Sequence, residues 1–135
     1  MTDAQAQALF AAGRVAHLAT ASAGGCPHLV PIVFVVHGDH IYSAVDAKPK
    51  RTTALRRLAN VRENACVALL VDHYDDADWS ALWWVRADGR GRVLEPEQEE
   101  AQRAVALLHE RYPQQEKTGV VLAVDVERWS GWSAR

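Results

Sequence analysis

The chain has 135 residues, a formal net charge of −2, 49% hydrophobic residues and 24% charged residues, which is the composition of one ordinary globular domain. The nearly balanced charge excludes an overall field that would attract nucleic acid or an anionic membrane, and no apolar run approaches the ~20 residues of a membrane span. Residues 1–10 lack the pattern of a signal peptide, so we expect a cytoplasmic protein. The two cysteines, Cys26 and Cys66, are expected to be free thiols, with a disulfide or redox pair as the alternative.

The first half of the chain predicts helices and strands in alternation. Thr2 or Asp3 caps a short helix that ends at Gly13. Residues 28–36 are almost continuously apolar and rich in β-branched side chains, which predicts a strand buried on both faces. The other elements expected here are a strand at 14–20, a hairpin turn at 37–40, a strand at 41–45 and a helix at about 52–62.

The second half predicts a hairpin and a long helix. Asp88-Gly89 is the strongest short hairpin signal available, so we expect a turn there between two strands. Pro96 suits the first position of a helix that Pro113 stops after about Tyr112. The elements expected here are strands at 66–71, 79–87, 91–95 and 119–126 and an acidic loop at 72–78.

These elements predict a single α+β domain spanning residues 1–135. Strands joined by tight hairpins cannot be parallel, so the sheet is mainly antiparallel. Twisted strands with little helix cover bury themselves best by curling into a small barrel. We expect about six strands in that barrel, with two or three peripheral helices.

The most informative segment is the basic loop that contains Lys48, Lys50 and Arg51 and leads directly into a helix. A helix N-terminus carries a partial positive charge and unpaired N–H groups, so cations crowd there unfavourably unless an anion is also present. Arg56 and Arg57 follow in the next turn. The segment therefore predicts a phosphate-binding cradle, with a solvated basic turn as the alternative.

Pro31 interrupts the apolar strand at 28–36. Proline cannot donate a hydrogen bond to a ladder, so the residue predicts an edge strand or a bulge. Such a gap leaves backbone groups free to meet the polar edge of a flat heterocycle, and the alternative is a barrel corner without a ligand.

The five tryptophans are a second source of ligand contacts. Trp83 and Trp84 are adjacent in a strand, so their side chains point to opposite faces. One is expected in the core and the other against a ligand or a partner chain; the alternative is a core and dimer interface only. The six histidines show no metal-ligand spacing, so we expect no metal site.

The chain resembles the flavin/deazaflavin oxidoreductase superfamily in the run 27–33, in Tyr42-Ser43 and in the basic loop. This superfamily includes the pyridoxine-phosphate-oxidase-like proteins and the actinobacterial enzymes that use the deazaflavin coenzyme F-420. In the oxidase branch, a Tyr-Thr pair and a Ser-Arg-Lys segment hold the ribityl phosphate of the cofactor. Tyr42-Ser43 and Pro49-Lys50-Arg51 match these positions, with Lys and Arg exchanged. Residues 84–89 resemble the strand and turn that contribute to the partner's cofactor site.

The resemblance implies a homodimeric, six-stranded split β-barrel that binds F-420 between subunits and transfers a hydride to or from a small organic substrate. The C-terminal segment around Trp132 is shorter than in the oxidase, and the extra Lys48 favours the F-420 branch. The alternatives are an FMN-dependent oxidoreductase and a non-catalytic protein that binds a cofactor or tetrapyrrole. No catalytic residue is assigned, and the cofactor-binding residues implied are Val30, Pro31, Ile32, Tyr42, Ser43, Lys48, Lys50, Arg51, Trp84, Arg86 and Trp132.

Overall fold

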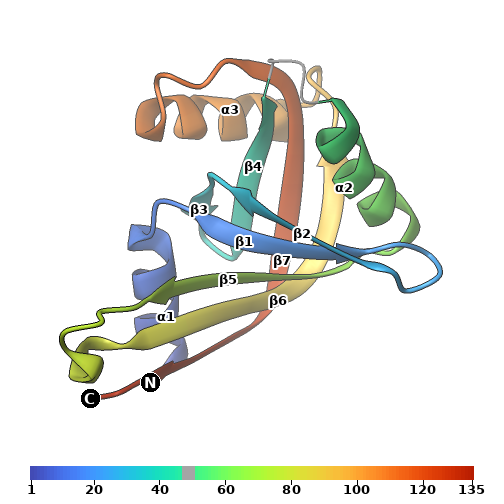
Figure 1. The fold of residues 1–135 in the computed structure, drawn as a ribbon. Coiled ribbons are helices and arrows are strands. Elements are labelled where there is room, and N and C mark those ends of the chain that lie inside the picture. Colours follow the sequence, from blue (N-terminus) through green and yellow to red (C-terminus); the bar gives the residue numbers. More distant parts are fainter. Residues whose placement is uncertain (47–50) are drawn as a thin grey trace.

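The computed structural model describes the backbone of residues 1–46 and 51–135, and the side chains outside residues 46–55. The described residues form helices that pack around one antiparallel sheet (Figure 1). In chain order the elements are α1 (Asp3–Ala12), β1 (Ala16–Ala21), β2 (Pro27–Ile32), β3 (Val35–His37), β4 (His40–Asp46), α2 (Arg51–Glu63), β5 (Cys66–His73), the short 3-10 helix η1 (Trp79–Ala81), β6 (Trp83–Leu94), α3 (Glu99–Arg111) and β7 (Lys117–Ser133).

The sheet has the strand order β2-β1-β5-β6-β7-β4-β3, and each neighbouring pair is antiparallel. The predicted α+β class and antiparallel sheet are confirmed, but the count of six is wrong because the sheet has seven strands. The two edge strands, β2 and β3, are consecutive in the chain and joined only by Val33 and Phe34. This short link requires the sheet to curl until its edges approach each other (Figure 1). Closure into a split barrel remains a prediction.

The predicted single strand at 28–36 is wrong in two respects. The structure divides it into β2 and β3, and β2 alternates between exposed and buried residues instead of being buried on both faces. Leu29 is 67% exposed while Val30 is 9% exposed, since only one face of this strand meets the core. The expected edge position of Pro31 is confirmed, because β2 is the first strand in the sheet.

The predicted hairpin at Asp88-Gly89 is also wrong. β6 includes both residues without interruption. Its pairing with β7 shifts register between them, which marks a bulge. A Cβ atom at Gly89 would collide with the carbonyl oxygen of Asp125 on β7. The absence of a side chain at Gly89 therefore allows the two strands to approach closely. The predicted strand at 119–126 extends to Ser133, because the C-terminal residues pair with the first half of β6.

The helix boundaries follow their local signals. Thr2 caps α1 through a capping box with Gln5, and the helix ends at Gly13 as predicted. α3 begins at Glu99, later than the predicted Pro96, because the backbone N–H of Gln98 bonds to the carbonyl of Glu95 and forms a turn first. No helix in the described part of the chain is long and apolar enough to cross a membrane.

The sheet has two faces that the helices cover unequally. We call the inner face the one that packs on the main core, which includes Phe10 of α1 and Val61 of α2. The opposite, outer face is covered by α3 over one end only, where Leu108 packs against Tyr42 and Leu94. The adjacent tryptophans point to opposite faces as predicted: the side chain of Trp83 packs on the inner core, so that of Trp84 points outward. The contact of the outward ring with a ligand or a partner chain stays a prediction.

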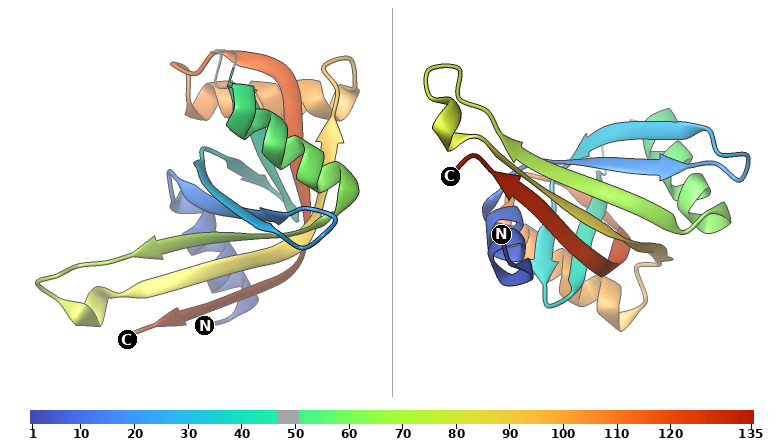
Figure 2. Two further views of the ribbon diagram at one scale, coloured as in Figure 1. Left: turned by 45° about the vertical axis from the view of Figure 1, so that its right-hand side comes forward. Right: turned by 90° about the horizontal axis from the view of Figure 1, so that it is seen from below.

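β5, β6 and β7 are long enough to extend beyond the rest of the sheet as an arm. Figure 2 shows this arm with η1 and the C-terminus at its tip, away from α2 and α3. The tip carries the exposed rings of Tyr74 and Trp79, whose centroids are 6.5 Å apart. Much of the outer face of β5–β7 therefore lies away from α3.

Candidate cofactor site

The basic loop leads into α2, as predicted, but most of it lies outside the described residues. Lys48 and Lys50 are among residues 47–50, and Arg51 is the first residue of α2 with a side chain that is not described. The position of the helix itself is well defined, because Asn60 donates a 3.1 Å hydrogen bond to the hydroxyl of Thr20 on β1 and both side chains are buried. This contact fixes the C-terminal half of α2 relative to the sheet.

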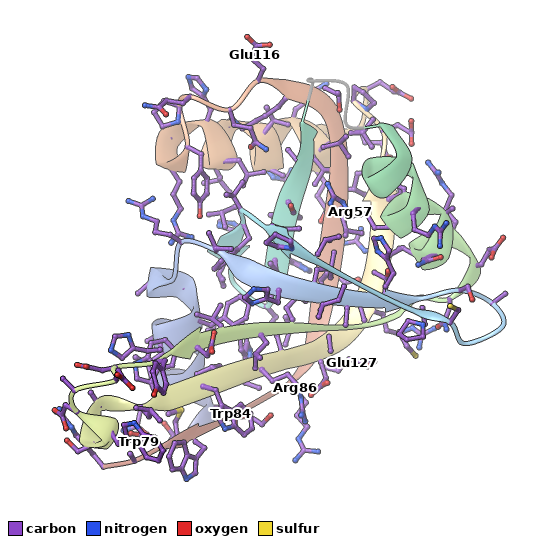
Figure 3. The ribbon with its side chains drawn as sticks, in the orientation of Figure 1. Arg57, Trp79, Trp84, Arg86, Glu116 and Glu127 are labelled. Carbon is purple, nitrogen blue, oxygen red and sulfur yellow. The ribbon has the colours of Figure 1, made fainter. Side chains whose placement is uncertain are left out.

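Arg57 is the described cation nearest to that loop on the sheet-facing side of α2. Its side chain lies between α2 and the sheet in Figure 3 and is partly buried. Burial lowers the pKa of the Arg57 guanidinium from its ordinary value. In the described part of the chain no carboxylate pairs with it. Arg57 is the seventh residue of α2, and a partly desolvated cation in this position favours an anionic ligand.

The predicted residues of β2 lie on both faces of the sheet. Val30 and Ile32 point to the inner face and are buried in the main core, so their side chains cannot touch a ligand in this arrangement. Pro31 is exposed between them, opposite His17 of β1. Of these three predicted residues, only Pro31 has an exposed side chain.

The predicted pair on β4 is divided in the same way. Ser43 points inward, and its hydroxyl donates a 2.9 Å hydrogen bond to the carbonyl of Val33. Tyr42 points outward beneath α3, and its hydroxyl donates a 2.7 Å hydrogen bond to Glu100. Both side chains are buried and engaged within the chain.

Trp84, Arg86 and Trp132 come together on the outer face of the arm. Trp84 and Trp132 are directly opposite each other on β6 and β7, and Arg86 is opposite Ser130. Figure 3 shows Trp84 and Arg86 in succession along β6. The Arg86 guanidinium lies 6.0 Å from the centre of the Trp84 ring and donates a 2.9 Å hydrogen bond to Asp88. These are flat aromatic surfaces beside a cation.

Ser130 was not identified from the sequence, yet its hydroxyl oxygen is buried without a hydrogen-bond partner. Ser130 is two residues from both Arg128 and Trp132 on β7, so all three side chains lie on the outer face. A predicted strand over residues 127–133 would have revealed this period of two. A buried hydroxyl without a partner is uncommon in folded proteins and indicates a missing polar contact. Together with the aromatic and cationic residues beside it, this hydroxyl marks a candidate ligand surface.

A charge network separates this surface from Tyr42 along the same face. Arg92 of β6 donates two hydrogen bonds of 2.9 Å to Glu100 and two of 2.7 and 2.8 Å to Asp125. Hydrogen bonding to Arg92 lowers the pKa of Glu100 to about 2 and also lowers the pKa of Asp125. The ring nitrogen Nδ1 of His40 lies 2.8 Å from Asp125. The network orients Tyr42, and the sequence offered no spacing that would reveal it.

The predicted residues therefore divide between the two faces of the sheet. Tyr42, Trp84, Arg86 and Trp132 are on the outer face, with Pro31 at its edge, whereas Val30, Ile32 and Ser43 are on the inner face. Among the predicted residues whose side chains the structure describes, Trp84, Arg86 and Trp132 lie together on one surface of the chain.

The fold and sequence were compared with known proteins. No curated protein matches the chain. The structure is similar to a conserved hypothetical protein from Mycobacterium tuberculosis (TM-score 0.76, 23% identity, covering 100% of this chain and 86% of that one). It is also similar to an FAD-binding protein from Mesorhizobium loti (TM-score 0.72, 22%, 97% and 94%) and to HutZ, the heme storage protein from Vibrio cholerae (TM-score 0.72, 17%, 98% and 95%).

These structural similarities concern the fold. The family described as Pyridoxamine 5'-phosphate oxidase matches residues 2–133, nearly the whole length of the chain. This match agrees with the superfamily that the basic loop and Tyr42-Ser43 resemble. The chain belongs to the pyridoxamine 5'-phosphate oxidase family.

Proposed function

We propose that this protein is an oxidoreductase that binds a phosphorylated flavin-type cofactor, and that the cofactor is the deazaflavin F-420. The observation that carries the proposal is Arg57: a partly buried guanidinium with a lowered pKa, on the sheet-facing side of the helix that follows Lys48, Lys50 and Arg51. Side-chain cations and the free N–H groups of a helix start are the donors that a phosphate group requires.

The outer face of the arm fits the ring system of such a cofactor. Trp84 and Trp132 offer flat apolar surfaces, Arg86 offers a cation, and the hydroxyl of Ser130 has no partner in the chain. When bound, the cofactor supplies the hydride chemistry. The residues of this chain need only hold it, orient it towards a small organic substrate and exclude water.

The two halves of this proposed site are on different parts of one chain, so a homodimer completes it. The basic start of α2 binds the phosphate in one subunit, and Trp84, Arg86 and Trp132 of its partner cover the ring. The outer face supports such a dimer, since Leu29 is 67% exposed and lies in one row with Ala19 and Ala68 on neighbouring strands. A row of exposed and half-exposed apolar side chains indicates an interface.

Two other functions have support. The similarity to the Mesorhizobium loti FAD-binding protein favours an FMN-dependent or other flavin oxidoreductase. The similarity to the Vibrio cholerae heme storage protein favours non-catalytic binding of a tetrapyrrole. F-420 is preferred because it continues beyond its phosphate into a lactyl-oligoglutamate tail, and Arg51, Arg56 and Arg57 with the two lysines exceed the charge of a single phosphate.

The test is the colour and affinity of the purified protein. Produced in a host that makes FMN but no deazaflavin, it is expected to be nearly colourless and to bind added F-420 more tightly than FMN or haem. The preference for F-420 over FMN should shrink as salt rises, because exposed charge contacts are screened. Purification with stoichiometric FMN that F-420 cannot displace would establish the flavin alternative, and an intense Soret band would establish the tetrapyrrole alternative.

A further inference from the structure

A cavity of about 230 Å³ opens on the outer face between α3 and the β3–β4 hairpin. It lies beside the part of β4 that carries Tyr42, at the opposite end of the outer face from Trp84 and Trp132. Its lining includes Tyr42, Ala106 and Leu107, together with the polar side chains of His37, Arg103 and Glu110. Such a surface binds the flat apolar part of a small molecule.

The two ends of the cavity carry opposite charges. Arg103 and Glu110 both line it and belong to the same helix, α3. They are about two turns apart, so their backbones are separated by roughly 10 Å along the helix axis. Neither side chain forms an ion pair within 4.0 Å in the described part of the protein. Each charge is therefore free to pair with a ligand.

The Tyr42 side of the cavity is held rigid by the charge network described above. The hydroxyl of Tyr42 donates a 2.7 Å hydrogen bond to Glu100, and Arg92 donates a 2.9 Å hydrogen bond to each oxygen of that carboxylate. The His40 ring lies 5.9 Å from the Tyr42 ring on the same strand. A wall that is ordered before binding reduces the entropy lost when a ligand enters.

We propose that this cavity binds a small zwitterion with a flat apolar centre, such as an aromatic acid that carries an aminomethyl group. The carboxylate of the ligand pairs with Arg103, its ammonium group pairs with Glu110, and its ring lies on Tyr42 and Leu107. The residues involved are all from the described part of the chain, and the proposal does not depend on which cofactor the protein binds.

Binding is tested on the full-length protein by two-dimensional NMR titration with para-(aminomethyl)benzoate, benzoate and benzylamine. We expect amide shifts confined to α3, β3 and β4, and about tenfold tighter binding of para-(aminomethyl)benzoate than of either singly charged probe. This factor corresponds to about 1.4 kcal/mol, close to the lower end of the range for one charge-assisted contact.

Two variants test the two charged ends of the cavity independently. Arg103→Gln should weaken benzoate but not benzylamine, and Glu110→Gln should weaken benzylamine but not benzoate. The matched controls, Arg62→Gln and Glu97→Gln, remove the same charges from exposed positions outside the cavity and should change neither affinity. Shifts that map elsewhere, no saturable binding, or equal effects of the cavity and control variants would overturn the proposal. Both substituted residues are exposed, so the variants are expected to fold normally, which circular dichroism checks.

Discussion

The hydroxyl of Tyr42 donates a 2.7 Å hydrogen bond to Oε2 of Glu100, an oxygen that also accepts a 2.9 Å hydrogen bond from Arg92. The bond joins α3 to the sheet, because Tyr42 belongs to β4 and Glu100 to the first turn of α3. Burial, followed by the hydrogen bond to Glu100, raises the pKa of Tyr42 to about 12. The same cluster lowers the pKa of Glu100 to about 2, chiefly through the hydrogen bond from Arg92.

These two shifts predict that stability falls at both extremes of pH. A raised pKa for Tyr42 means that its stabilising contribution is complete below pH 10.0 and is lost as the pH rises towards about 12. A lowered pKa for Glu100 means that its contribution is complete above pH 4.5 and is lost as the pH falls towards about 2. Urea unfolding across pH measures both. Tyr42→Phe should remove the Tyr42 contribution to the alkaline decline; if that decline is unchanged, Tyr42 is not its source.

Arg57 is expected to reduce stability while serving binding. Arg57→Met keeps much of the side-chain volume and removes the desolvated charge, so the free energy of unfolding should stay equal or rise. Cofactor affinity should fall by about tenfold or more, because a charge-assisted hydrogen bond contributes ~1.5–3 kcal/mol. Denaturant unfolding and a cofactor titration on the same sample measure the two effects. The exposed Arg62→Met is the control, and unaltered affinity in Arg57→Met would refute the phosphate assignment.

The basic loop gives a second binding prediction. Lys50→Ala combined with Arg51→Ala should weaken cofactor binding strongly and leave the circular dichroism spectrum unchanged, since two charge-assisted contacts are lost. The control is Arg62→Ala combined with Arg90→Ala, which removes two cations from exposed positions away from the start of α2. Equal affinities for the two double variants would mean that the loop is a solvated turn.

The exposed outer face predicts a homodimer in solution. Light scattering should report twice the mass of one chain at micromolar concentration. Leu29→Glu should raise the dissociation constant of the dimer by about tenfold or more, because it places a charge in an apolar contact. Tyr74→Glu alters a residue that is 58% exposed on the loop after β5 and is the control for a general effect of charge. A wild-type protein that remains a single chain would contradict both the dimer and the shared site.

The sequence predicted the element types well because their signals are local. The capping residue Thr2, the apolar stripe of α3 and the β-branched run before the hairpin at 37–40 each act over a few positions. The Asp88-Gly89 signal failed because the same dipeptide suits a bulge, and only the pairing of β6 with Asp125 of β7 distinguishes the two. Strand ends are set by partners distant in the sequence, which is also why the strand predicted at 119–126 extends to Ser133 in the structure.

The candidate site was harder to predict because it depends on which face of the sheet each side chain occupies. Adjacent residues in a strand point in opposite directions, so Tyr42 and Ser43 could not both contact one ligand through their side chains. The same alternation directs the side chains of Val30 and Ile32 into the core, away from any ligand on the outer face. The burial of the Arg57 guanidinium and of the Ser130 hydroxyl is set by the fold, and no single-sequence pattern reports it.

The prolines of β2 determine how copies of this chain can meet. Pro27 and Pro31 occupy the same side of an edge strand, and a proline there is tolerated where its nitrogen faces away from the ladder. Between them only Leu29 retains an N–H group on that outward side. A neighbouring chain therefore finds too few donors to add itself as an extra strand, so open-ended growth of the sheet is disfavoured. Copies of this chain are therefore expected to associate through the faces of their sheets. A symmetric contact of this kind uses the same surface on both copies, so it closes as a dimer.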